Sequence, residues 1–361
     1  MYEILTPTAT TERSYTLDAM RGVAALLVVS YHFCGVVCPI EGHGYLAVDF
    51  FFILSGLVVS MAYSKKLSTT LFASEFIVKR FIRLWPLFAI GLCFALVKPF
   101  AQMVLNYPGL GPEKAIVAFS TEIFMLPSFV NGVELFPLNG PAWSLFFEIA
   151  INIVFGLWLF KAKPAVLVVI GGGAGICLAM AAAQAGTLNI GWGWDTFLSG
   201  VFRVTFGFIC GIILEKLGVG RQSGKPSYWC LVPIGVLAAV LMLKVPPILH
   251  WQYDLIIALL VSPMLVAVGA RWQPPFFLKT FFKFLGDISF PIYAVHFSLI
   301  YAWAFIARKL LDLPSQALLP VFLAFIVGLA WVLIHIDARV RRLLFAGYAA
   351  LKAKGSLRKE R

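Results

Sequence analysis

Long apolar runs, separated by short polar or proline-containing segments, make up most of this 361-residue chain. A helix needs about 20 mostly apolar residues to cross roughly 30 Å of hydrocarbon, because each residue adds about 1.5 Å. Ten runs approach that length: 20–40, 46–63, 84–105, 142–160, 165–185, 197–214, 228–245, 252–270, 288–306 and 315–334. Helix-breaking prolines such as Pro108 and Pro164 lie between the runs. The pattern predicts an all-α, polytopic membrane helix bundle with about ten transmembrane helices.

The composition agrees with a lipid environment. Hydrophobic residues are 61% of the chain, charged residues are only 13%, and the mean hydropathy is +0.90. An ordinary soluble domain has about 25% charged residues. We therefore expect one integral membrane domain over residues 1–338, followed by a basic cytoplasmic tail over residues 339–361.

Basic residues are distributed unevenly between the two sides of the predicted bundle. With a cytoplasmic N-terminus, 23 of the 29 lysines and arginines fall on the inner side. The positive-inside rule then predicts that both termini are cytoplasmic. This asymmetry and contact with anionic lipid headgroups account for the net charge of +12, so we expect membrane lipids and no nucleic acid as partners. The six cysteines lack metal-ligand spacing, and we expect no metal and no permanently bound cofactor.

A few ionisable residues interrupt the apolar runs, and such residues are functional candidates because they are costly in hydrocarbon. They are His32, Asp49, Glu148 and His296. Arg21 precedes His32 by eleven residues, a helical rotation that puts both side chains on one face, roughly 16 Å apart. This arrangement suits a long ligand with phosphates at one end and a reactive group at the other, such as a coenzyme A thioester.

Two more arginines belong to the same predicted inner side. Arg80 and Arg83 are three residues apart on an expected interfacial helix running from Phe72 toward Leu84, so both should point one way. Guanidinium groups bind phosphates in a bidentate manner, which favours an anionic-ligand site beside Arg21. The alternative is that they only set the topology and touch lipid phosphates.

Five segments carry a family resemblance. LDAMRGVAALLVVSYHF, VDFFFILSGLV, RFIRLWPLF, LNGPAWSLFFEI and SFPIYAVHF, in this order, resemble the motifs of the membrane acyltransferase 3 family. The resemblance implies a bacterial inner-membrane O-acyltransferase. Such an enzyme moves an acyl group, usually acetyl, from cytoplasmic acyl-CoA to a hydroxyl of an envelope polysaccharide or lipid-linked glycan.

The matching motif positions give the candidate site. We expect His32 to be the general base, since histidine titrates near neutral pH, with Asp49 or Glu148 orienting it. An acyl-histidine intermediate is the alternative route. We assign donor phosphates to Arg21, Arg80 and Arg83, and substrate contacts to Trp143, Ser144, Tyr293 and His296.

Two other functional classes compete with this interpretation. A proton-coupled transporter also places His, Asp and Glu in its core, but the chain shows no internal repeat of the kind common in such folds. A lipid-binding scaffold gives no reason for Arg21 and His32 to share a face. Arg203 is either an acceptor or carboxylate contact or a snorkelling side chain. The segment 106–141 is expected to shape the acceptor entrance.

Overall fold

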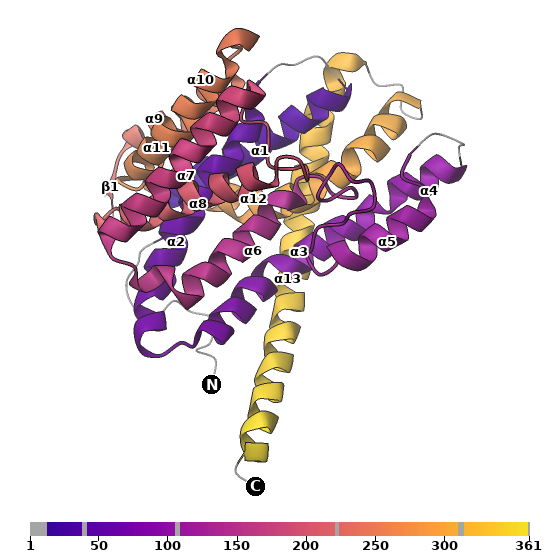
Figure 1. Cartoon of the computed structure of the whole chain (residues 1–361). Coiled ribbons are helices and arrows are strands. Elements are labelled where there is room, and N and C mark those ends of the chain that lie inside the picture. Colours follow the sequence, from indigo (N-terminus) through magenta and orange to yellow (C-terminus); the bar gives the residue numbers. More distant parts are fainter. Residues whose placement is uncertain (1–12, 38–41, 105–108, 221–223, 310–313, 360–361) are drawn as a thin grey trace.

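The computed structural model describes residues 13–37, 42–104, 109–220, 224–309 and 314–359, and this part of the chain is mostly helical. Its α-helices (Figure 1) are α1 (Tyr15–Val37), α2 (Ala47–Thr69), α3 (Ala73–Ala95), α4 (Val97–Val104), α5 (Pro112–Glu122), α6 (Ala142–Leu157), α7 (Pro164–Ala185), α8 (Phe197–Lys216), α9 (Leu231–Met242), α10 (His250–Ile256), α11 (Ser262–Gly269), α12 (Phe276–Lys309) and α13 (Ser315–Lys359). A π-helical turn (Ile257–Val261) joins α10 to α11, and β1 (Lys225–Pro226) pairs in parallel with β2 (Trp272–Gln273).

The spanning helices follow the predicted runs, with a difference in number. Among the described residues, eight helical stretches are long and apolar enough to cross a membrane: Tyr15–Val37, Gly44–Thr69, Ala73–Val104, Pro164–Ala185, Phe197–Lys216, Pro247–Gly269, Phe276–Ala304 and Ala317–Ala353. The fourth and seventh predicted spans fall on the shorter apolar helices Ala142–Leu157 and Tyr228–Met242. These helices are shorter than predicted because the chain leaves helical geometry at Trp158 and at Leu243, before the two prolines at 246 and 247. The helical membrane class is confirmed, whereas a count of ten full-length spans is not.

The expected interfacial helix before the third span is not a separate element. Helix α3 runs without interruption from Ala73 to Ala95, so Arg80 and Arg83 lie on the same helix as the apolar residues that follow them. A proline at position 86 lies inside this helix without ending it. The two arginines therefore project from the first half of a span.

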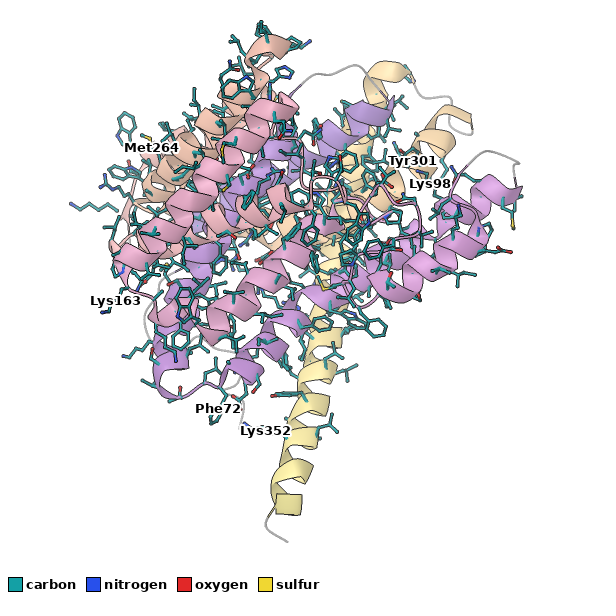
Figure 2. The ribbon with its side chains drawn as sticks, in the orientation of Figure 1. Phe72, Lys98, Lys163, Met264, Tyr301 and Lys352 are labelled. Atoms are coloured by element: carbon teal, nitrogen blue, oxygen red, sulfur yellow. The ribbon has the colours of Figure 1, made fainter. Side chains whose placement is uncertain are left out.

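The outer surface of the bundle is apolar over much of its area. Large hydrophobic side chains such as Met264 and Phe72 are 65% and 74% exposed, and Figure 2 shows Met264 directed away from the ribbon. A soluble protein rarely leaves so many large apolar side chains in water. The exposed apolar surface is consistent with helices that face lipid.

Helices α1 and α12 pack against each other and run in the same direction. Arg21, in the first half of α1, contacts Ser289. His32, eleven residues later, contacts His296, seven residues after Ser289. The prediction that Arg21 and His32 share one face of their helix is therefore confirmed, and α12 is the helix that this face meets.

Glycines allow these two helices to approach closely. A Cβ added to Gly22 of α1 would lie 2.6 Å from the Cβ of Leu285, and one added to Gly286 would lie 2.6 Å from the Cβ of Asp18. Both distances are shorter than real Cβ contacts, so each position needs glycine. Small residues at such crossings are typical of membrane helices.

The last helix is much longer than the membrane is thick. Helix α13 has 45 residues and would extend roughly 68 Å, more than twice the hydrocarbon thickness. Figure 1 shows its C-terminal half leaving the bundle as a continuation of the same helix. Lys352 on this extension forms an ion pair with Glu75 near the start of α3, which fixes the extension to the end of the bundle where α3 begins.

Candidate active site

Two histidines from α1 and α12 form a hydrogen-bonded pair inside the bundle. His32 Nδ1 lies 3.0 Å from His296 Nε2, and His296 is fully buried. His296 Nδ1 lies 2.9 Å from the Tyr293 carbonyl oxygen and 3.2 Å from that of Ile292. The interhelical histidine contact joins positions 264 residues apart in the chain.

The tautomers of the pair follow from its hydrogen bonds. A carbonyl oxygen only accepts, so His296 Nδ1 carries a proton, and in a neutral ring its Nε2 is then an acceptor. His32 Nδ1 must therefore donate to His296 Nε2. For two neutral rings, this assignment leaves His32 Nε2 with a free lone pair. The arrangement gives His32 the tautomer that a general base or nucleophile needs.

Aromatic rings surround His32. The rings of Tyr31 and Phe297 meet the imidazole edge-on, at centroid distances of 5.3 and 5.4 Å. Tyr31 is itself held by a hydrogen bond of 2.9 Å from Asn189 Nδ2 to its hydroxyl. Aromatic rings thus flank the imidazole on two sides, while His32 keeps part of its surface exposed.

Arg21 is bound to the N-terminal half of α12. Its Nε donates to Ser289 Oγ at 2.9 Å and its Nη2 donates to the Gly286 carbonyl at 2.9 Å and to Asp18 at 3.0 Å. Asp18 also pairs with Arg13. The guanidinium is therefore held in a fixed orientation but keeps 28% of its side-chain surface exposed.

Arg80 and Glu148 form an ion pair between α3 and α6, in which Arg80 is buried and Glu148 is partly exposed. Arg80 Nη2 donates to Glu148 Oε1 at 2.8 Å, and Ser55 Oγ donates to the same oxygen at 3.0 Å. Arg80 is only 7% exposed, and its Nε has no hydrogen-bond partner within the described residues. An unpaired buried N–H is costly, so this donor is available for a ligand oxygen.

Four arginines gather at one end of the bundle. Arg83 interacts electrostatically with Arg21, Arg80 and Arg341. Arg83 is exposed, whereas Arg80 is buried. Within the described chain, no carboxylate forms an ion pair with Arg83. We call these four residues the arginine cluster. Arg341 was not predicted as a site residue because it lies in the basic tail, where its partner is Asp337.

Asp49 is paired with an arginine and not with His32. Arg203 donates from Nε to Asp49 Oδ1 at 3.0 Å and from Nη2 to Oδ2 at 2.7 Å. Both side chains are buried, and the guanidinium carbon lies 5.1 Å from the centroid of the Trp143 ring. Of the two predictions for Arg203, the structure shows the carboxylate contact and not snorkelling. Trp143, predicted to bind substrate, here packs on this ion pair.

Ser144 and Tyr293 meet one turn before the histidine pair. The Tyr293 hydroxyl lies 2.7 Å from Ser144 Oγ and 3.2 Å from the Pro141 carbonyl oxygen. Both side chains are buried and use their polar atoms on each other. The contact joins the start of α6 to the middle of α12, beneath His296.

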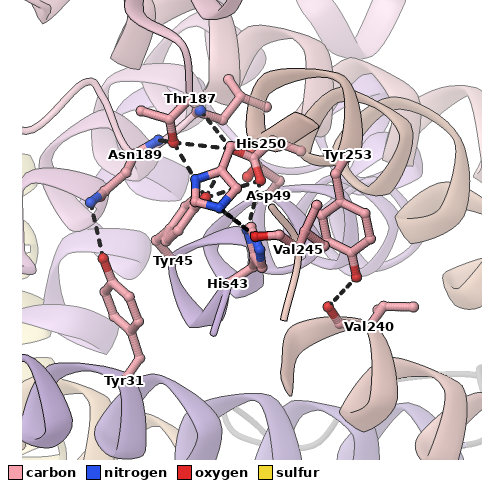
Figure 3. A network of polar contacts seen from close by, with 12 residues as sticks. Tyr31, His43, Tyr45, Asp49, Thr187, Asn189, Val240, Val245, His250 and Tyr253 are labelled. Atoms are coloured by element: carbon pink, nitrogen blue, oxygen red, sulfur yellow. Dashed lines mark hydrogen bonds and ion pairs between the residues drawn. The ribbon is translucent and has the colours of Figure 1, made fainter. Parts of the chain in front are cut away.

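A second polar network (Figure 3) lies at the N-terminal end of α2, which is the end away from the arginine cluster. Asp254 accepts hydrogen bonds from the Tyr45 hydroxyl at 2.8 Å and from Thr187 Oγ1 at 3.0 Å. His43 Nδ1 lies 2.9 Å from the other carboxylate oxygen. Asn189, two residues after Thr187, extends the network to Tyr31 beside His32. No sequence motif indicated these contacts, which join three distant segments.

The fold and this site define a multi-pass helical membrane protein with a histidine pair inside the bundle and arginines at one end. The chain belongs to the membrane acyltransferase 3 family, because the profile described as "Acyltransferase domain" matches residues 14–336. It is also 36% identical over 186 residues to "Protein 2 in picA locus" of Rhizobium radiobacter, an alignment that covers 48% of this chain and 96% of that protein. No solved structure matches the chain. The protein is therefore a membrane acyltransferase, and the family argues against the transporter alternative.

Proposed function

We propose that this protein transfers an acyl group, normally acetyl, from cytoplasmic acyl-CoA to a hydroxyl of an envelope polysaccharide or lipid-linked glycan in the bacterial inner membrane. The observation that carries the proposal is the 3.0 Å His32–His296 contact, which leaves His32 Nε2 free on the same helix faces that hold Arg21. A base inside the bundle and cations at its end are what an acyl-CoA reaction across a membrane requires.

The arginine cluster is the proposed donor-binding site. Coenzyme A carries several phosphate charges, and guanidinium groups bind phosphate with two parallel hydrogen bonds. Arg83 has no ion-pair partner in the described chain, and the buried Arg80 Nε has no acceptor. From this cluster the pantetheine arm would follow the α1–α12 contact toward His32, a distance of roughly 16 Å from Arg21.

The proposed reaction uses only the two substrates and His32. His32 Nε2 removes the proton of the acceptor hydroxyl as its oxygen attacks the thioester carbonyl carbon. The C–S bond breaks, the new C–O ester bond forms, and the proton passes from His32 to the leaving thiolate of coenzyme A. During the step the imidazolium keeps its Nδ1–H bond to His296. An acyl-histidine route uses the same free Nε2 as a nucleophile.

The two motif carboxylates have supporting roles in this proposal. Glu148 is bound to Arg80 and Asp49 to Arg203, so neither orients His32 in the structure. We assign the orienting role to His296. Glu148 then fixes Arg80 for the donor, and Asp49 fixes Arg203 between the segments that surround the acceptor side.

The test is acetyl transfer by purified full-length protein from labelled acetyl-CoA to base-treated envelope polysaccharide, from which existing esters have been removed. His32→Ala should lower turnover by roughly 10²-fold or more, because positioned proton transfer contributes about that much. His335→Ala is the matched control, since His335 is exposed on α13. Near wild-type turnover in His32→Ala, with both variants folded, would remove His32 from the mechanism.

A further inference from the structure

Two cavities adjoin at the end of α3 that lies away from the arginine cluster. The larger has a volume of about 340 Å³ and the smaller about 90 Å³. They share the lining residues Ala95, Lys98, Glu134, Pro137 and Leu138. Lys98 follows Arg80 by eighteen residues, a separation of roughly 27 Å along the helical path. The cavities therefore open toward the opposite side of the bundle from the proposed donor site.

The smaller cavity ends beside the histidine pair. Gly140, Phe297, Ser298 and Tyr301 line it in addition to the shared residues. The Phe297 ring is also a wall of the His32 environment, 5.4 Å from the imidazole centroid. Phe297 is thus a wall that the smaller cavity and the proposed base have in common.

A basic and an acidic side chain, Lys98 and Glu134, lie where the two cavities join. Lys98 Nζ lies 3.7 Å from the centroid of the Tyr301 ring, and Figure 2 shows these residues close together. Lys98 also interacts electrostatically with Glu134, whose Oε2 accepts a hydrogen bond of 3.0 Å from Asn131 Nδ2. A sugar hydroxyl both donates and accepts, so a lysine, a carboxylate and an amide suit a polyhydroxylated ligand. The larger volume lies within the range of about 300–1,000 Å³ typical of small-molecule sites.

We propose that these two cavities bind the acceptor. Lys98, Glu134 and Asn131 hold one sugar unit in the larger cavity, and its reacting hydroxyl passes through the smaller cavity and past Phe297 to His32. This assignment rests on the proposed acyl transfer. It makes Lys98 and Glu134 specificity-determining residues for the acceptor, and the expected class of acceptor is a polyhydroxylated glycan.

The experiment measures transfer from labelled acetyl-CoA at increasing concentrations of base-treated envelope polysaccharide, alongside equilibrium binding of labelled acetyl-CoA. Glu134→Gln and Lys98→Met should each raise the half-saturating polysaccharide concentration about tenfold, as expected for loss of a hydrogen bond to a charged group. Acetyl-CoA binding should stay unchanged. Glu113→Gln is the matched control, because Glu113 carries an exposed carboxylate and lines neither cavity.

A steric variant tests the route independently of charge. Ala95 lines both cavities and is buried, so Ala95→Leu adds three carbons at their junction. Transfer should fall more than tenfold while the thermal midpoint and acetyl-CoA binding are retained. Unchanged half-saturation in Glu134→Gln, Lys98→Met and Ala95→Leu would overturn the acceptor site while leaving the proposed function intact. Absence of transfer by the wild-type protein would instead overturn both.

Discussion

At the scale of single residues, the site depends on a pair of imidazoles whose protons are set by backbone carbonyl oxygens. The carbonyls of Tyr293 and Ile292 accept from His296, His296 accepts from His32, and His32 Nε2 is left free. A histidine usually receives this help from a carboxylate, as in hydrolase triads. A neutral acceptor fixes the tautomer without placing a second charge inside the apolar bundle, where charge is costly.

His296 should therefore act through His32. In His296→Leu the acceptor is lost, His32 can adopt either tautomer, and kcat should fall roughly tenfold or more while the KM for acetyl-CoA is unchanged. His296→Gln keeps a carbonyl oxygen at a similar reach and should restore part of the rate. The measurement is steady-state transfer by all three proteins. Equal rates in the Leu and Gln variants would show that His296 only fills space.

Substitutions of the two arginines of α3 should have different effects, because the environments of the two side chains differ. Arg83 is exposed and unpaired in the described chain, so Arg83→Gln should raise the KM for acetyl-CoA several-fold without loss of stability. Arg80→Gln leaves the partly buried Glu148 without its cation and should also lower the thermal midpoint. Arg83→Lys should substitute only in part, because it loses the bidentate geometry.

Lys79→Gln serves as the control for the arginine variants, because it removes a basic residue from the same turn of α3 without touching Glu148. Dephospho-coenzyme A donors add a second readout, since the loss of a phosphate should reduce the difference between wild type and Arg83→Gln. An acetyl-CoA affinity unchanged in both arginine variants would make these residues topology signals only.

At the scale of elements, the contact between α1 and α12 determines whether the site forms at all. An added Cβ at Gly22 collides with Leu285, so Gly22→Ala should push the helices apart, lower the thermal midpoint and reduce transfer more than tenfold. Gly172→Ala is the control, because a Cβ there meets nothing within 4 Å and alanine favours the helix by up to about 1 kcal/mol. Equal activity of the two variants would contradict the role given to this crossing.

The elements themselves were largely predictable from the sequence, whereas their partners were not. Apolar runs located the spans, and helical rotation correctly put Arg21 and His32 on one face. Periodicity defines a face but does not say which helix meets it, so the contact between His32 and His296 could not be derived. The same limit applies to Asp49, which the sequence offered to His32 and the structure gives to Arg203, 154 positions away.

At the scale of the whole molecule, the two proposed substrates approach from opposite ends. Helix α12 passes Ser289 beside Arg21, then His296, then Tyr301 at the cavities. In oriented proteoliposomes, labelled acetyl-CoA supplied on the side of the arginine cluster and polysaccharide on the other should give product. The reversed arrangement should give little, because a polyanion has no matching cations at the cavity end comparable to the cluster.

Sidedness is established in the same vesicles by protease cleavage of the C-terminal extension of α13. Protein that an added protease cleaves has the extension, and with it the arginine cluster, on the outside of the vesicle. Efficient transfer with acetyl-CoA confined to the cavity side would require a different donor site.

The ion pair between Asp49 and Arg203 has a consequence for biosynthesis. Translation at about 5–20 residues per second places α2 in the membrane roughly 8–30 seconds before α8 is complete. Over that interval Asp49 has no counter-charge, and because it lies in the first turn of α2 the cost is below the figure of about 3 kcal/mol for a carboxylate at the centre of a spanning helix. His32 is without its partner for longer, because His296 lies on α12. The nascent chain must therefore keep its polar residues sheltered by the insertion machinery until late, and a ribosome stalled before residue 276 would leave a membrane-inserted but inactive product.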